Sequence, residues 1–190
     1  MNASPAMESG GPLLCLGATV TLRSTAGTRT LTVDGLLAGP GRTTAQPGEL
    51  LEQVEIPLPA TDTTGSCYAR LEYRRQMEIA VVGATAVITL EDDAVTDARI
   101  AITALAPTIR RVPAAESALI GTTAGPEAID AAAAAVAAAS MPISDVRASA
   151  EYRSAMAAVI GRRAIGAALA RARGEHVPVP ASPALHGGLR

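Results

Sequence analysis

The sequence predicts an α+β fold: a three-stranded antiparallel sheet packed with three helices and preceded by a smaller α+β segment. Residues 68–73 alternate polar and apolar side chains, and residues 79–90 form a largely apolar run that Gly83, Thr85 and Thr89 interrupt. Both patterns are typical of β-strands. From residue 113 onward, alanine-rich segments that begin at or next to a proline replace the strand pattern, which favours helices. A run of strands followed by a run of helices indicates the α+β class.

The first 63 residues predict a small, strand-rich unit. Two short β-rich runs flank a turn at residues 24–27, which predicts a hairpin. Residues 57–65 are rich in Pro, Thr and Gly and predict a linker, so we place a domain boundary between residues 63 and 64. The other elements expected are a helical turn at 13–16, strands at 18–23, 29–33 and 49–56, and a loop at 34–41.

Residues 64–173 predict the main domain. Three strands with tight connections suggest a meander, because consecutive strands usually pair. The longest helix carries Tyr152, Met156, Val159 and Ile160 on one face, and we expect this stripe, Tyr152 included, to be buried. Residues 174–190 are predicted to form a disordered tail. The main-domain elements are strands at 68–73, 79–90 and 95–105, a charged corner at 74–78, and helices at 114–120, 126–140 and 149–173.

Composition excludes several classes of function. The chain has 190 residues and a net charge of −2, and it contains no Phe or Trp, so neither the charge nor the stacking groups of a nucleic-acid-binding protein are present. Cys15 and Cys67 are far apart, which predicts two free thiols and no metal site. The sequence has no apolar stretch of the ~18 residues that a spanning helix needs and no leader pattern. A cytoplasmic protein is expected.

Three blocks of the sequence resemble one protein family. Residues 68–82 carry Y-x-R-L-x-x-R-R-x-M-E-I-A-V-V, residues 2–6 read N-A-S-P-A, and residues 143–153 contain S-D-V-R-A-S followed by Y-R. All three resemble segments of the FAD-binding medium subunit of the molybdenum hydroxylases, the relatives of xanthine dehydrogenase and aerobic carbon monoxide dehydrogenase. The blocks occur in the family's order, and the resemblance runs from residue 2 to about residue 173.

The resemblance implies a component of an oxidoreductase rather than a complete enzyme. Such a subunit passes electrons from iron–sulfur clusters through FAD to an acceptor. Its partners are an iron–sulfur small subunit and a large subunit that carries the molybdenum cofactor. Residues 1–63 would be part of the FAD-binding subdomain, and residues 64–173 its C-terminal domain. No catalytic residue or metal ligand is implied, and the residues expected to contact FAD are Asn2, Ser4, Glu8, Leu51 and Arg70.

Each of these residues also has a simpler interpretation. Arg70 occupies a position where the family often carries a Lys close to the flavin, and Arg keeps the charge but changes the hydrogen-bonding geometry. It could equally be an ordinary exposed strand residue. Glu8 falls where the family has Asp, and a solvated loop acid would give the same sequence. Leu51 matches a position that packs on the cofactor, yet a core leucine looks the same.

Two charged groups are expected to have structural roles. Arg74, Arg75 and Glu78 could steer an anionic partner, but pairing with one another at a solvated corner is favoured. In the third block, Ser144 and Asp145 with Tyr152 and Arg153 are expected to cap a helix and form a buried Tyr–Arg–Asp hydrogen-bond set.

The family's glycine-rich phosphate loops have no counterpart in this sequence, which contains no G-x-G-x-x-G and no P-loop. Rows of backbone N–H groups in such loops hold a pyrophosphate. We therefore expect FAD in the complete subunit but not its retention by this chain alone. Two alternatives stay open: a flavin-free module that docks on partner subunits, and a truncated product without activity of its own.

Overall fold

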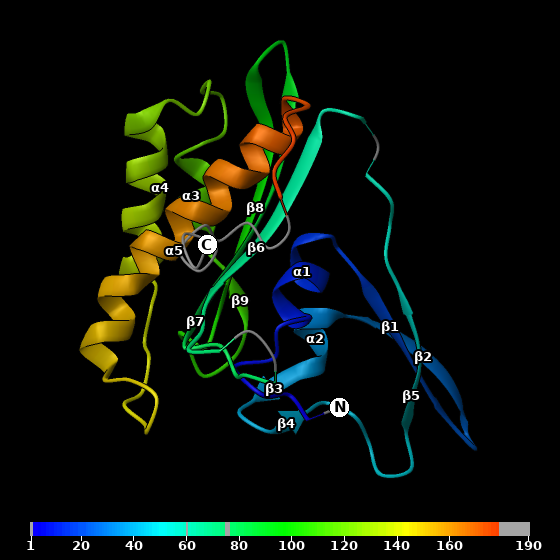
Figure 1. Ribbon diagram of the computed structural model, residues 1–190. Coiled ribbons are helices and arrows are strands. Elements are labelled where there is room, and N and C mark those ends of the chain that lie inside the picture. The colour runs from blue at the N-terminus through cyan, green and yellow to red at the C-terminus, as the bar shows by residue number, and fades with distance from the viewer. Residues whose placement is uncertain (1, 60, 75–76, 179–190) are drawn as a thin grey trace, which may run out of the picture.

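The computed structural model describes residues 2–59, 61–74 and 77–178, and a four-stranded antiparallel sheet occupies its centre (Figure 1). Its strand order is β6-β7-β8-β9, with β6 spanning Thr64–Leu71, β7 Val82–Glu91, β8 Ala94–Thr103 and β9 Arg110–Arg111. The predicted meander of three strands is confirmed. The predicted number of three strands was wrong, because a fourth strand, β9, pairs with β8 at Ala101 and Ile102. This strand of two residues is too short to produce a sequence pattern.

The helices cover one face of this sheet. They are α3 (Pro113–Ser117), α4 (Pro126–Ala138) and α5 (Ala150–Ala172), close to the predicted ranges. Helix α5 packs on β6 and β7, and α4 packs on α5. A Cβ atom added to Gly65 of β6 would lie 2.0 Å from the Ala168 carbonyl oxygen of α5, so the two backbones touch. The core between the layers is built from Ile, Val, Leu and Ala, including Ile88, Ile100, Ile102, Ile160 and Ile165.

The predicted apolar stripe of α5 was partly wrong. Tyr152 is 45% exposed, whereas Ile160 is 1% exposed and Arg153 is 3% exposed. The Ser149 side chain accepts a hydrogen bond from Tyr152 N at 3.1 Å, which confirms the helix cap. The buried face continues through small residues, Ala157, Gly161, Ala164 and Ala168. The spacing of apolar residues three and four positions apart predicted the helix correctly. At the start of the helix, however, it assigned Tyr152 to the buried face, where Arg153 lies instead.

The N-terminal segment covers the opposite face of the same sheet. Helix α1 (Gly10–Cys15) packs against β7 and β8, and a second core cluster joins Leu14, Cys15 and Leu22 to Val87 and Ala101. Gly11 lies so close to the sheet that a Cβ atom would be 2.6 Å from Thr85 Oγ1. The hydrophobic core therefore crosses the predicted boundary between residues 63 and 64.

The remaining elements lie to the right of α1 and below it in Figure 1. Strands β1 (Thr19–Ser24), β2 (Gly27–Thr32) and β5 (Leu50–Glu55) form a sheet of order β2-β1-β5, which confirms the hairpin. The predicted loop at 34–41 was wrong, because this segment contains α2 (Val33–Leu36) and β3 (Leu37–Gly39), the latter paired with β4 (Arg42–Thr43). The Thr32 side chain caps α2 by accepting from Gly35 N at 3.4 Å.

The C-terminal end of the described chain lies beside α5. Glu175 N donates to Ala170 O, and Arg171 donates to the carbonyls of Val177 and Pro178. The rest of the predicted tail, residues 179–190, lies outside the described residues. None of the helices in the described ranges combines the length and the apolar character that crossing a membrane requires.

Candidate functional site

A cavity of about 290 Å3 lies where β7 begins and β8 ends. Its walls come from segments that are far apart in the sequence: Ser4–Pro5–Ala6, Ile79–Ala80, Ala104–Pro107 and Met141–Ile143, with Asp145, Arg147 and Arg153 adding charge. A mostly apolar cavity with a few polar groups is the usual form of a small-molecule site. A second cavity of about 270 Å3, lined in part by residues 57–59 and Thr61, contains none of the predicted site residues.

The N-A-S-P-A segment forms one wall of the first cavity as a fixed turn. Ala3 is buried and has a φ of 42°, and its carbonyl accepts from Gly41 N at 3.0 Å. The Pro5 carbonyl accepts from Ala104 N at 2.8 Å, which ties the turn to the end of β8. Ser4 is exposed at the cavity, and its Oγ accepts from Ala6 N at 3.3 Å.

The predicted residues Glu8 and Arg70 are in contact. Arg70 lies on β6 and forms ion pairs with Glu8, which precedes α1, and with Glu72. The side chains of Arg70, Glu8 and Glu72 are 22%, 37% and 12% exposed. Partial burial disfavours the charged guanidinium, but the hydrogen bond to Glu8 and the negative charges of Glu8 and Glu72 raise the pKa of Arg70 above its ordinary value. The cation is therefore held permanently between two carboxylates.

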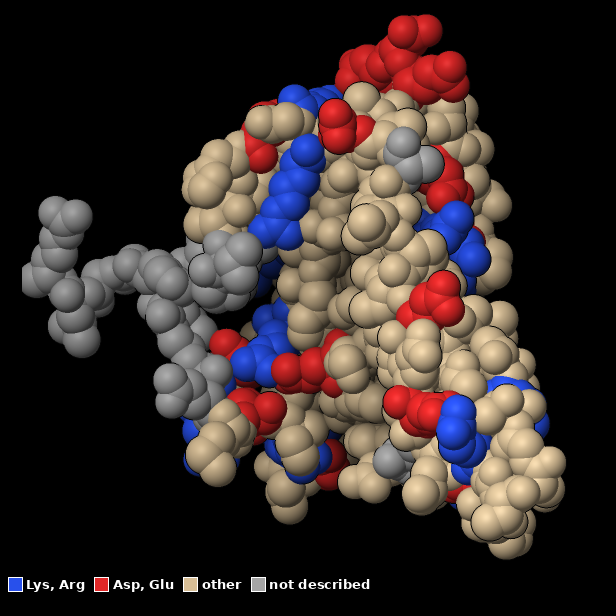
Figure 2. All heavy atoms as spheres, turned by 90° about the vertical axis from the view of Figure 1, so that its right-hand side faces the viewer, with Lys and Arg blue, Asp and Glu red and all other residues tan. Residues whose placement is uncertain are grey.

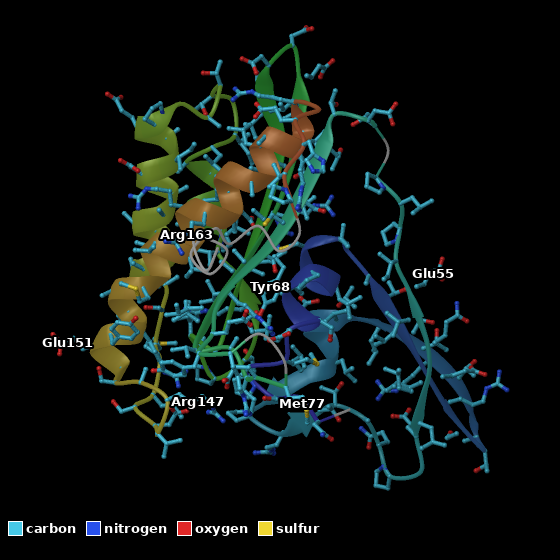
Figure 3. All side chains as sticks on the ribbon, viewed as in Figure 1. Glu55, Tyr68, Met77, Arg147, Glu151 and Arg163 are labelled. Atoms are coloured by element: carbon cyan, nitrogen blue, oxygen red, sulfur yellow. The ribbon has the colours of Figure 1, made fainter. Side chains whose placement is uncertain are left out.

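Tyr68 lies next to this cluster and was not predicted as a site residue. Figure 3 shows it on β6, beside α1. Its hydroxyl is buried and has no hydrogen-bond partner among the described residues. Burial, assisted by the negative charge of Glu8, raises the pKa of Tyr68. The hydroxyl therefore stays protonated at neutral pH and can donate a hydrogen bond.

The structure separates Leu51 from the other predicted residues. Leu51 is 37% exposed on β5 and is paired with Leu22 of β1. In Figure 3, Glu55 marks β5 at the right edge of the molecule, whereas Tyr68 lies near its centre. Asn2 is exposed at the start of the described chain. Ser4, Glu8 and Arg70 thus lie around one end of the central sheet, and the sequence alone could not show that Leu51 lies elsewhere.

The charged corner and the third block also have defined contacts. Arg74 Nε lies 3.3 Å from Glu78 Oε2, which supports the interpretation that the residues of the charged corner pair with one another. Arg75 lies outside the described residues. The prediction that Tyr152 joins a buried hydrogen-bond set with Arg153 and Asp145 was wrong. Arg153 pairs with Asp145 at 2.6 Å, but the tyrosine that reaches this loop is Tyr73, whose hydroxyl donates to the Arg147 carbonyl.

Charged side chains of both signs are mixed on the face of the molecule that Figure 2 shows. Figure 2 shows basic and acidic side chains interspersed over the face that carries the outer strands. Among the described residues visible there, basic side chains do not gather into one patch. The electrostatic footprint of a nucleic-acid-binding surface is therefore not seen on this face.

Comparison with known protein families gives two adjacent matches. Residues 67–168 match the family model described as the CO dehydrogenase flavoprotein C-terminal domain. Residues 1–59 match the model described as the FAD binding domain in molybdopterin dehydrogenase. The segment between the two matches, residues 60–66, contains the predicted boundary at residues 63–64.

Similar proteins carry related descriptions. The chain is 35% identical over 173 residues to the carbon monoxide dehydrogenase medium chain of Afipia carboxidovorans, covering 90% of this chain and 59% of that one. It is 35% identical over 159 residues to the nicotine 6-hydroxylase medium subunit of Paenarthrobacter nicotinovorans, with 84% and 55% covered. The chain thus spans less than two thirds of the length of these relatives.

Solved structures share the fold. CO dehydrogenase from Oligotropha carboxidovorans superimposes with a TM-score of 0.84 at 34% identity, covering 90% of this chain and 59% of that one. Quinoline 2-oxidoreductase from Pseudomonas putida 86 superimposes with a TM-score of 0.81 at 28% identity, covering 91% and 58%.

Proposed function

The chain belongs to the CO dehydrogenase flavoprotein C-terminal domain family, and from this premise we propose that it is the C-terminal portion of a FAD-binding electron-transfer subunit of a molybdenum hydroxylase. In this proposal electrons reach FAD from an iron–sulfur small subunit and leave to an acceptor. A large subunit with the molybdenum cofactor is the other partner. The observation that carries the proposal is the contact of Glu8 with Arg70, two residues 62 positions apart that the resemblance assigns to the flavin.

The residues present fit the ring end of a flavin. FAD, when bound, supplies one- and two-electron redox chemistry. The apolar walls of the cavity suit an aromatic ring, and the exposed Ser4 at its edge can hydrogen-bond to a ring heteroatom. In our proposal Arg70 supplies a cation that would stabilise the negative charge of a reduced ring. Glu8 and Glu72 orient that cation from two sides.

The residues present do not fit the pyrophosphate end equally well. Gly10 and Gly11 are the only adjacent glycines in the described part of the chain, and both are buried. Cβ atoms placed on them would meet Ile109 at 2.3 Å and Thr85 at 2.6 Å. This pair packs α1 on the sheet and leaves no room for a phosphate. Our proposal therefore assigns Ser4, Glu8 and Arg70 to the ring end of FAD and assigns no residue to the pyrophosphate.

A flavin-free docking module is the second candidate, and exposed apolar side chains favour it. They lie on loops at the cavity end of the molecule: Tyr73, Met77, Ile79, Met141, Ile143 and Val146, with exposed fractions between 46% and 99%. Large exposed apolar patches often mark binding surfaces. A cytoplasmic location belongs to the same proposal, supported by two free, buried cysteines of the kind expected in a reducing compartment.

A flavin titration tests the proposal directly. Riboflavin carries the ring without the pyrophosphate, and quenching of its fluorescence reports binding to the purified chain. We expect saturable binding that weakens about tenfold in Arg70→Met, since one charge-assisted contact is worth about 1.5–3 kcal/mol. Arg23→Met is the matched control, because Arg23 pairs with Glu52 on the outer sheet. Absence of saturable binding by the parent chain, or equal losses in both variants, would overturn the flavin site and leave the docking module.

A further inference from the structure

We propose that Arg153, a buried residue of α5, is a positioning residue that fixes the shape of the candidate cavity by holding three of its walls together. The inference rests on the proposed function only for the identity of the ligand, a flavin ring. The positioning itself rests on contacts within this chain.

The guanidinium of Arg153 makes three hydrogen bonds to three separate segments. Nη1 donates to the carbonyl oxygens of Val81 at 3.0 Å and Ala104 at 3.4 Å. Nη2 donates to Asp145 Oδ1 at 2.6 Å. The side chain is only 4% exposed. Arginine suits this task because its planar group presents five donors in a fixed geometry, whereas lysine presents a single ammonium.

Each acceptor belongs to, or directly follows, a wall of the cavity. Val81 follows Ile79 and Ala80, while Ala104 and Asp145 line the cavity themselves. Asp145 is in turn held by Arg147, whose backbone N donates to Oδ1 at 2.8 Å. A helix residue thus connects the start of β7, the end of β8 and the loop before α5 at one point.

Through Ala104, the hydrogen bonds of Arg153 are also connected to the N-A-S-P-A turn. Ala104 N donates to the Pro5 carbonyl at 2.8 Å, while its own carbonyl accepts from Arg153. Ala104 has a φ of 61°, a left-handed conformation that is unfavourable for alanine and persists only where the surroundings enforce it. Hydrogen bonds on both sides of this residue supply that enforcement. Removing the guanidinium should therefore release Pro5 as well as Ala104.

Arg153 also carries a donor, Nε, that these three hydrogen bonds do not use. Nε is buried and has no hydrogen-bond partner among the described residues. A buried donor without an acceptor is unfavourable, and Arg153 lines the cavity.

The test compares Arg153→Met with Arg162→Met, a matched change on the same helix. Arg162 is 49% exposed and pairs with Asp130, away from the cavity. Two quantities are measured: the hydrogen-exchange rate of the Ala104 amide by NMR, and the riboflavin dissociation constant. We expect Arg153→Met to accelerate Ala104 exchange and to weaken riboflavin binding by at least about tenfold each, because tenfold is the size of a single lost charge-assisted contact. Arg162→Met should change neither.

A double variant separates positioning from general destabilisation. Glycine adopts left-handed conformations without strain, so Ala104→Gly in the Arg153→Met background should recover part of the riboflavin affinity. Arg153→Lys serves if Arg153→Met does not fold, and it should show the same two effects at smaller size. Unchanged Ala104 exchange in both Arg153 variants, or the absence of any recovery by Ala104→Gly, overturns the positioning role. A parent chain that binds no riboflavin overturns the flavin site. The Ala104 exchange rate would still decide whether Arg153 fixes the end of β8.

Discussion

At the residue scale, two adjacent side chains at the start of α5 have opposite environments. Arg153 is buried among backbone carbonyls and Asp145, whereas Tyr152 is 45% exposed. Successive helix positions point in directions about 100° apart because the helix has 3.6 residues per turn. A buried arginine at this position therefore turns its aromatic neighbour away from the core.

This difference predicts unequal costs for two truncations. Tyr152→Ala should lower the free energy of unfolding by no more than about 1 kcal/mol, the range of ordinary half-exposed positions. Ile160→Ala removes a side chain that is 1% exposed and should cost about 2–5 kcal/mol. Urea denaturation of both variants and the parent measures the difference. A larger loss in Tyr152→Ala than in Ile160→Ala would contradict the orientation of α5.

The thiols give a second prediction at this scale. Burial raises the pKa of Cys15 to about 12 and also raises the pKa of Cys67, so neither forms the reactive thiolate near pH 8. We expect the native chain to react slowly with an aromatic disulfide reagent at pH 8, and the urea-unfolded chain to react at both cysteines. Rapid reaction of the native protein would show that one of the thiols is accessible.

At the scale of elements, contact between backbones decides which glycines can be replaced. The tightest contact joins β6 to α5 at Gly65, where a Cβ atom would lie 2.0 Å from Ala168 O and 2.3 Å from Ala172 N. No atom within 4 Å would meet a Cβ at Gly166 of α5. The two positions therefore form a matched pair within one helix–strand unit.

Alanine substitutions at these two glycines should have opposite signs. Gly65→Ala must push α5 off the sheet and should destabilise the chain by about 1–3 kcal/mol or more, as overpacking does. Gly166→Ala removes a flexible residue from a helix interior and should stabilise it by about 0.5–1 kcal/mol. Thermal unfolding followed by circular dichroism compares them. Equal melting temperatures would mean that β6 and α5 are not in backbone contact.

The outer sheet contains a pH-dependent connection between β2 and the loop before β5. Arg29 donates to both carboxylate oxygens of Glu49, at 2.7 and 2.8 Å, and Gln46 N donates at 2.6 Å. The hydrogen bond from Arg29, with that from Gln46, lowers the pKa of Glu49 from 4.5 to about 2. A lowered pKa in the folded state stabilises the fold above pH 4.5, and this contribution is lost as the pH falls from 4.5 towards 2.

Replacing Glu49 should therefore change the acid side of the stability profile. In Glu49→Gln the carboxylate is absent, so stability should fall less steeply between pH 4.5 and 2 than it does in the parent. Urea midpoints measured at several pH values in this range provide the comparison. Parallel profiles for parent and variant would show that the pair with Arg29 does not contribute.

At the scale of the whole molecule, the central sheet has helices on one face and the N-terminal segment on the other. Helices α3, α4 and α5 form one core with it, and α1 forms the second core with Val87, Ala101 and Ile109. The candidate cavity lies where these layers meet, since its walls include Ser4–Ala6 on one side and Arg153 on the other. Neither half of the chain forms this cavity alone.

We expect the purified chain not to retain FAD through gel filtration. The described residues offer contacts to the ring end, while Gly10 and Gly11 are occupied by packing. Each missing charge-assisted hydrogen bond to the pyrophosphate forfeits roughly 1.5–3 kcal/mol, and each 1.4 kcal/mol is about a tenfold loss of affinity. The absorption spectrum of the eluted protein measures retention. Stoichiometric flavin bands would direct attention to residues 39–44, where Gly39, Gly41 and Arg42 are available.

The sequence by itself determined the class of fold, the order of the elements and the family. Periodicity and proline positions depend on local conformation, so the strands of the meander and the long helices could be predicted within a few residues. Three ordered blocks carried the family resemblance, and they also identified Glu8 and Arg70, which are 62 positions apart and in contact. Local patterns could not show that α2 and β3 replace the predicted loop, since these short elements depend on the Thr32 cap and on pairing with β4.

Tertiary structure alone decided how the site is built. It separated Leu51 from Arg70, exposed Tyr152, and brought Arg153 to carbonyls 49 and 72 positions away. It also buried Gly10 and Gly11, the first residues of α1, against Ile109 and Thr85. The physical reason is that a side chain's environment depends on which layers meet around it. The free energy of burying a guanidinium or a glycine pair is set by partners distant in the chain, and those partners leave no local pattern in the sequence.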